Sequence, residues 1–102
     1  MIHVIATIEL QPGVRDRFLA EVAGLVPAVR AEAGCIEYGA AVDAASGLGP
    51  QIALRPDVVT IIEKWETLDH LRAHAVAPHM QSYRGRVKEF VVRTTLQVLT
   101  PA

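Results

Sequence analysis

The sequence has a single cysteine, no surplus of positive charge and no long apolar run, and each of these features excludes a class of structure or partner. Its 102 residues include one cysteine, Cys35, so no intrachain disulfide can stabilise the fold. There are 10 Lys and Arg residues against 11 Asp and Glu, which leaves no surplus of positive charge for gripping nucleic acid. No apolar run approaches the roughly 20 residues that a membrane-spanning helix requires. We therefore expect neither a nucleic-acid nor a membrane partner.

The N-terminus lacks the features of a secretory signal. Met1 leads directly into a β-branched apolar segment, with no basic region and no cleavage site. Together with the lone Cys35, this favours a reducing cytoplasm. A chain of 102 residues, of which 51% are hydrophobic, has the length and composition of one globular domain over 1–102.

The spacing of apolar residues predicts alternating strands and helices. Residues 2–10 read as a strand, and residues 13–32 carry apolar side chains at helical spacing. Pro12 is expected near the first helical position, and Pro27 is expected to bend the helix or end its regular part early. Further strands are predicted over 35–43, 57–66 and 91–100, with a long loop over 44–56.

Two shorter helices are predicted between the last two strands. Thr67 offers an N-cap for the first, and Pro78 ends it and starts a second over 79–90. Apolar or aromatic residues occupy the inward positions of both helices: Leu68, Leu71, Ala75, Met80, Tyr83, Val87 and Phe90. The β-α-β-β-α-β order predicts an α+β, ferredoxin-like split β-α-β fold with an antiparallel four-stranded sheet.

Both faces of the predicted sheet carry apolar side chains. In segment 57–66, Glu63 and Trp65 share one face, and Ile62 and Lys64 lie on the other. Helices on one side can cover only one face, whereas a solvated face would be plainly polar. We therefore expect a homodimer in which the Glu63/Trp65 face meets the helices and lines a cavity. The Ile62/Lys64 face would meet the second copy.

Trp65 and two histidines are the first candidates for chemistry. Trp65 is the only tryptophan, and it is either a core anchor or a flat wall for an aromatic ligand. His74 and His79 lie five residues apart with a helix break between them, whereas a metal-binding pair on one helix prefers a spacing of four. Because no third ligand is evident near them in the sequence, we expect no metal site.

Two tyrosines extend this set. His79 falls in the first turn of the helix that begins at Pro78, where the helix dipole disfavours an imidazolium. A neutral imidazole there either caps the helix or acts as a hydrogen-bond donor or proton acceptor. Tyr83 shares a helix face with His79 and suits either the core or the binding of a quinone or enol oxygen. Tyr38, in the middle of a predicted strand, is a weaker candidate.

Four segments, taken in order, resemble the antibiotic biosynthesis monooxygenase domain, especially its small quinol monooxygenase-like members. They are 8–13 (IELQPG), 26–38 (VPAVRAEAGCIEY), 63–66 (EKWE) and 74–79 (HAVAPH). The resemblance implies a dimeric α/β barrel with an active cavity between helices and sheet. It also implies that O₂ oxidises a quinol or polycyclic phenol to a quinone there, with no metal, flavin or haem cofactor, because the substrate carbanion itself reduces oxygen.

The resemblance also implies roles for individual residues. Trp65 would be the aromatic of the cavity, and we add Glu63, on the same strand face, and the weaker candidate Tyr38 as substrate-binding residues. The polar groups aimed at substrate oxygens would be those of His74, His79 and Tyr83.

The family is functionally mixed, which leaves alternatives open. Haem-degrading relatives place an Asn late in the first strand and a haem-ligating His on the last helix. Here Ala6 and Thr7 occupy that strand and Tyr83 lies near that His, which argues against haem. Another relative isomerises a phosphorylated dione and shares the stretch from His74 to His79. An isomerase, or a dimer that binds a small aromatic without turnover, therefore remains an alternative.

Overall fold

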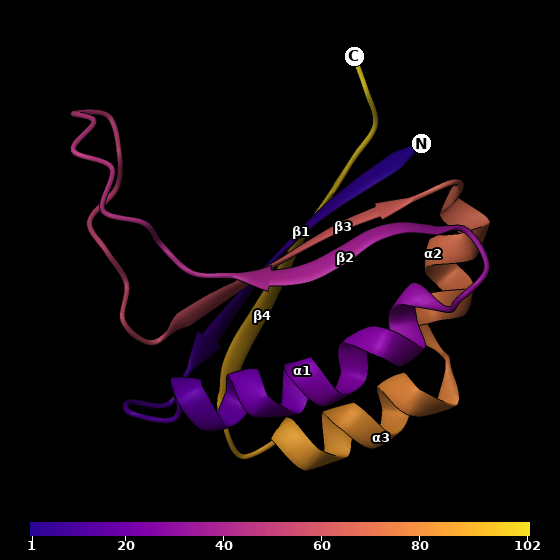
Figure 1. The fold of residues 1–102 in the computed structure, drawn as a ribbon, viewed down its shortest axis with the longest axis horizontal. Helices are drawn as coiled ribbons and strands as arrows, with labels where there is room; N and C mark the ends of the chain where they lie inside the picture. Colours follow the sequence, from indigo (N-terminus) through magenta and orange to yellow (C-terminus); the bar gives the residue numbers. More distant parts are fainter.

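Strands and helices follow one another in the order that the periodicity predicts (Figure 1). This computed structural model describes residues 1–102. Its elements are β1 (Ile2–Leu10), α1 (Arg15–Arg30), β2 (Cys35–Ala41), β3 (Val58–Trp65), α2 (Leu68–Ala75), α3 (Pro78–Val87) and β4 (Val91–Leu99).

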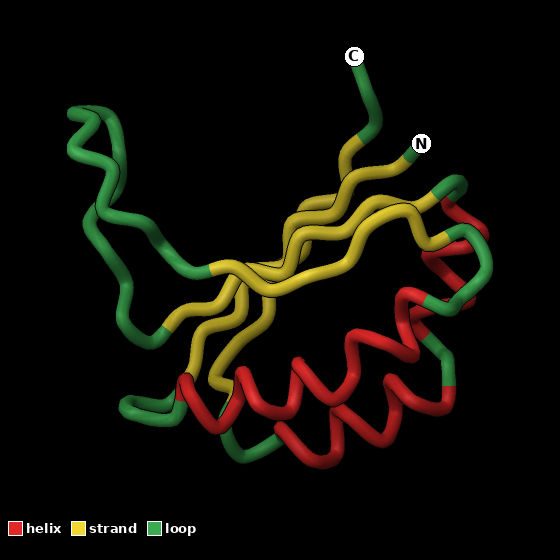
Figure 2. The backbone as a smooth tube through the Cα atoms, viewed as in Figure 1, coloured by secondary structure: helices red, strands yellow, loops and turns green.

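The four strands form one antiparallel sheet in the order β2-β3-β1-β4, which confirms the ferredoxin-like α+β prediction. All three helices lie on the same side of this sheet, so the molecule has two layers (Figure 2). The register pairs Val4 with Glu63 and Ile5 with Ile62. Because paired residues point to the same side, Glu63 faces the helices and Ile62 faces away from them.

The core lies between the two layers. Alternate residues of β1 and β3 are buried, and α1 buries a stripe of apolar residues against them: Phe18, Val22, Leu25 and Val29. The helices leave β4 uncovered. Leu96 pairs with Ala6 and therefore faces the helical side, yet it is 59% exposed. The space beneath β4 is thus open on the side where the helices lie.

Three details of the helices differ from the sequence-based expectation. Pro12 lies before α1, because Gly13 adopts a φ of 79° and the helix begins only at Arg15. Pro27 does not end α1, which continues to Arg30, because proline removes only its own N–H and burial of Val29 holds the last turn.

The last helix is shorter than predicted. α3 ends at Val87, and Phe90 follows in a turn where its half-buried ring still packs on the core. Its inward residues Met80, Tyr83 and Val87 are buried, as the helical spacing predicts. None of the helices is both long enough and apolar enough to span a membrane.

Residues 42–57, between β2 and β3, form neither helix nor strand, in agreement with the loop predicted over 44–56. The loop projects beyond the end of the sheet on the left of Figure 1. Arg55 closes its base on Asp43, with Nε 2.8 Å from Oδ2 and Nη2 2.9 Å from Oδ1. This pair holds the pKa of the Asp43 carboxyl down at about 2.

Candidate active site

A cavity of about 490 Å³ lies between the sheet and the helices α2 and α3. Twelve of its 17 lining residues are hydrophobic, including Val4, Ala6 and Ile8 of β1. Leu96 of the uncovered β4 also lines it. This size and apolar lining are typical of a site for a small molecule, for which a few convergent polar groups set the orientation.

Glu63 places a carboxyl group in the apolar cavity wall. Its side chain is buried, and Oε1 accepts a hydrogen bond of 2.9 Å from the indole Nε1–H of Trp65. Burial raises the pKa of Glu63, and the Trp65 hydrogen bond and the nearby His74 oppose this shift. Trp65 itself is fully buried and is not among the cavity-lining residues, so it reaches the cavity only through Glu63 and His74.

His74 is the buried histidine of the site. It lies in the last turn of α2, lines the cavity and is 5% exposed. Its ring packs against Trp65 at 4.7 Å between centroids and against Tyr38 at 5.6 Å. Its Nε2 lies 3.8 Å from Oε1 of Glu63. Aromatic packing on two sides therefore fixes the ring and directs one nitrogen toward the cavity carboxyl.

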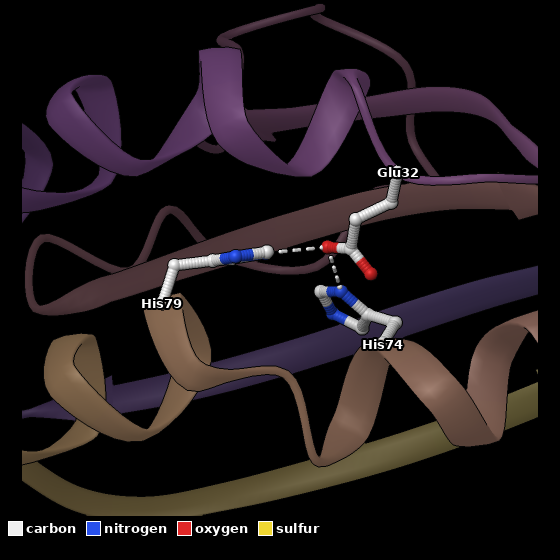
Figure 3. Close-up of side chains that lie close together, drawn as sticks. All are labelled: Glu32, His74 and His79. Carbon is white, nitrogen blue, oxygen red and sulfur yellow. Dashed lines mark hydrogen bonds and ion pairs between the residues drawn. The ribbon is translucent and has the colours of Figure 1, made fainter.

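Glu32 joins the two predicted histidines into one cluster (Figure 3). Its Oε2 lies 2.8 Å from Nδ1 of His74 and 2.7 Å from Nε2 of His79. An ionised Glu32 therefore accepts a hydrogen bond from each imidazole. The side chain of His79 is 31% exposed and that of His74 is 6% exposed, so the cluster connects the buried site with the surface.

The turn between α1 and β2 positions Glu32. Gly34 in this turn has a φ of 79°, and a Cβ there would lie 2.2 Å from Cγ of His70. Only glycine lets the turn pack this closely on α2. The carbonyl of Gly34 also accepts a 2.8 Å hydrogen bond from the Glu66 amide, which ties the turn to the end of β3. These contacts hold the Glu32 carboxylate within hydrogen-bond distance of His79, in the first turn of α3.

The two tyrosines line the cavity with buried side chains. Burial raises the pKa of Tyr83 to about 12, so its phenol remains a hydrogen-bond donor at neutral pH. Burial also raises the pKa of Tyr38 well above its ordinary value. Arg84 of α3 and Lys88, the residue that follows this helix, also line the cavity and add two positive charges to its wall.

The structure brings together most, but not all, of the predicted site residues. Glu63, His74, Tyr38 and Tyr83 line one cavity, whereas His79 lies outside it and contacts His74 through Glu32.

The sequence analysis missed three residues. No third ligand is near the two histidines in the sequence, but the fold brings Glu32 to both of them as a third potential ligand. Arg84 and Lys88 also line the cavity, although no motif in the sequence marks them as site residues. The only sequence signal for Glu32 is its place two residues before Gly34, within the family-like stretch 26–38.

Comparison with known proteins shows the family to which this sequence is similar. The family model described as antibiotic biosynthesis monooxygenase matches residues 1–86. The Escherichia coli (strain K12) protein named "Probable quinol monooxygenase YgiN" is 40% identical over 103 aligned positions, which cover 99% of this chain and 98% of that protein.

Solved structures agree on the fold. Rv0793 from Mycobacterium tuberculosis superposes with a TM-score of 0.78 at 26% identity, over 99% of this chain and 94% of that chain. PA3566 from Pseudomonas aeruginosa superposes with a TM-score of 0.80 at 24% identity, over 99% and 93% of the two chains.

Proposed function

Because the chain belongs to the antibiotic biosynthesis monooxygenase family, we propose that it oxidises a quinol or polycyclic phenol with O₂ in the cavity between helices and sheet. The observation that carries this proposal is an apolar cavity of about 490 Å³ into which His74, Glu63 and two tyrosines converge. A flat aromatic substrate matches the apolar walls, and its oxygens match these polar groups.

The proposed reaction begins with loss of the phenolic proton. His74 is the proton acceptor, since Glu32 holds its Nδ1 and leaves Nε2 directed toward Glu63 at the cavity. The protonated Tyr83 donates a hydrogen bond to a substrate oxygen. Arg84 and Lys88 favour the phenolate that forms. His79 does not touch the cavity, so its part is to relay a proton between Glu32 and solvent.

The electrons for oxygen reduction come from the substrate in this scheme. A phenolate with a hydrogen on its para carbon transfers an electron to O₂, after which carbon and oxygen combine. One oxygen atom becomes the new quinone carbonyl, and the other leaves as water with the two hydrogens that the substrate loses. The protein therefore needs no redox cofactor of its own, and the mainly apolar walls of the cavity limit side reactions.

The test is O₂ uptake with a panel of hydroquinones, naphthols and polycyclic phenols. With ¹⁸O₂, we expect one labelled oxygen atom in each quinone formed from a naphthol or polycyclic phenol that has a hydrogen on its para carbon. A hydroquinone already carries both oxygens, so its quinone should carry no label and O₂ should leave as hydrogen peroxide. His74→Gln should lower kcat/KM about 100-fold or more, and Tyr83→Phe about tenfold. Arg72→Ala, an exposed change on α2, should leave it unaltered. Uptake no faster than autoxidation on every substrate, or stoichiometric hydrogen peroxide without label in the product of the naphthols and polycyclic phenols, would overturn the proposal.

The cluster of Glu32, His74 and His79 also supports a second candidate, an isomerase that moves a proton at a carbon next to a carbonyl. Both histidines are linked to one carboxylate, which suits removal and return of a proton. Solvent deuterium exchange into small diones tests it. Exchange that is lost in His74→Gln supports the isomerase, and absence of exchange across the panel rejects it.

Two further features belong to this proposal. A homodimer would cover the sheet face around Ile62, which is only half-buried in the single chain. A location in the cytoplasm accords with the free thiol of Cys35.

A further inference from the structure

Three side chains from three separate segments converge at the edge of the cavity: Glu32 before β2, His74 in α2 and His79 at the start of α3 (Figure 3). Their ligand atoms, Oε2 of Glu32, Nδ1 of His74 and Nε2 of His79, all lie within 4.8 Å of one another. We propose that they form a binding site for one divalent transition-metal ion, with Zn²⁺ as the best match.

The donor set selects the class of ion. Two imidazole nitrogens and one carboxylate oxygen are ligands that Zn²⁺ accepts in tetrahedral sites, with the fourth position left for water. Mg²⁺ and Ca²⁺ instead prefer sites made of oxygen atoms alone. Tetrahedral ligands at Zn²⁺ bond lengths lie roughly 3.3 Å apart. The Glu32 oxygen lies 2.7 and 2.8 Å from the two nitrogens, and all three atoms lie within 4.8 Å of one another, so the carboxylate has to withdraw from between the imidazoles to admit the ion.

The surroundings of His74 hold it ready for this role. Its ring is fixed between Trp65 and Tyr38, so little rotational freedom is lost on binding. Its second nitrogen faces Glu63 at 3.8 Å. In metal sites, a carboxylate behind a ligating histidine is the common arrangement that orients the ring and raises its basicity.

The cluster is also open to an ion from solvent. The side chain of His79 is 31% exposed and that of Glu32 is 13% exposed, whereas His74 is buried behind them. His79 stands in the first turn of α3 and Glu32 stands in a surface turn, so both can shift without disturbing the core. The metal site is therefore accessible from outside the cavity.

The proposed metal site does not depend on the proposed oxidation, because metal binding can be measured without any substrate turnover. It has one consequence for that reaction, and only this consequence rests on the proposed function. The ion takes the atoms through which Glu32 connects His74 with His79, so Zn²⁺ is expected to inhibit O₂ uptake. Protein stripped with a chelator should be the more active form.

The experiment is a calorimetric titration of ZnCl₂ into chelator-treated, dialysed protein at neutral pH. We expect one ion per chain with a dissociation constant in the micromolar range or below, and no binding of Mg²⁺. Glu32→Gln and His79→Ala should each weaken binding at least tenfold, in line with the loss of a direct ligand. His3→Gln removes a histidine of β1 that lies outside the cluster and should leave the affinity unchanged.

Circular dichroism of each variant checks its fold, and the partly exposed His79 provides a test even if Glu32→Gln destabilises the turn. Zinc binding that is absent at 100 µM, or equal in the wild type and His79→Ala, overturns the metal site. Zinc binding without O₂ uptake on any substrate overturns the proposed oxidation alone. Oxygen uptake without zinc binding overturns the metal site alone.

Discussion

The two faces of the sheet hold polar groups in different ways. On the face toward the helices, Glu63 is buried and bonded to Trp65, beside the ring of His74. On the outer face, Lys64 pairs with Glu37 at 3.0 Å and Arg93 pairs with Glu9 at 2.6 Å, all with partly or largely exposed side chains. Polar groups on the inner face are thus desolvated, whereas those on the outer face remain in contact with water.

This difference indicates that the inner face carries the candidate active site and that the outer face is the candidate dimer interface. A buried carboxyl held by one indole has a raised pKa and a fixed position, which are features of a reactive site. Between the exposed ion pairs of the outer face, Ile5 and Ile62 oppose each other across β1 and β3 as a small half-buried apolar patch. Apolar centres with polar rims are typical of protein interfaces.

The largest expected effect comes from two neighbouring residues on opposite faces. Trp65→Ala should lower the free energy of unfolding by about 3–5 kcal/mol, because it leaves a large void and removes the hydrogen bond to Glu63. Lys64→Ala should cost less than about 1 kcal/mol, as expected for an exposed ion pair. Denaturant unfolding measures both. If Trp65→Ala does not fold, Trp65→Phe should still cost more than Lys64→Ala, and equal costs would contradict the comparison.

The next effect tests whether the outer face is an interface. Ile62→Glu places a charge in the centre of the patch and should weaken self-association at least tenfold, or about 1.4 kcal/mol. Because Ile62 is half-exposed in the single chain, the fold itself should be retained. Light scattering over a concentration series measures the change, with Ile36→Glu as the control at a site already 51% exposed. A wild-type protein that remains monomeric throughout would rule out the homodimer.

The elements could be predicted from the sequence because their signals are local. The alternation in residues 57–66 gives the two faces of β3, and Thr67 and Pro78 mark where α2 and α3 begin. Alternation gives the face of a side chain but not its depth. Trp65 was therefore expected as a possible cavity wall, although it lies fully buried behind the lining residues.

The centre of the candidate site depends on contacts that no local pattern contains. Glu32 meets His74 and His79 across separations of 42 and 47 residues. Its position depends on how the Gly34 turn packs against His70. His79 and Tyr83 were expected on one helix face, yet only Tyr83 lines the cavity, because Glu32 occupies the side where His79 emerges.

A smaller effect concerns the helix that carries His74 on the inner side. The Oγ1 of Thr67 accepts a 3.2 Å hydrogen bond from the His70 amide and caps α2. Thr67→Ala should lower the free energy of unfolding by about 1 kcal/mol. Thr67→Ser keeps a capping hydroxyl and should therefore retain most of that stabilisation. Thermal unfolding compares them, and equal stability of Thr67→Ala and wild type would contradict the capping role.

The smallest effect lies in the loop beyond both faces, at the Asp43–Arg55 pair that closes its base. The pair lowers the pKa of Asp43 from 3.8 to about 2, so its stabilising contribution is present above pH 3.8 and is lost as the pH falls through about 2. The Arg55 amide donates to Asp43 Oδ2, and its hydrogen exchange reports locally on the pair. Asp43→Asn should speed this exchange at pH 6, relative to the intrinsic rate, and leave the Val59 amide in β3 unchanged. If Arg55 is equally protected in both proteins at pH 6, the pair does not hold the loop, and its polar contacts resemble the weak ion pairs of the outer face.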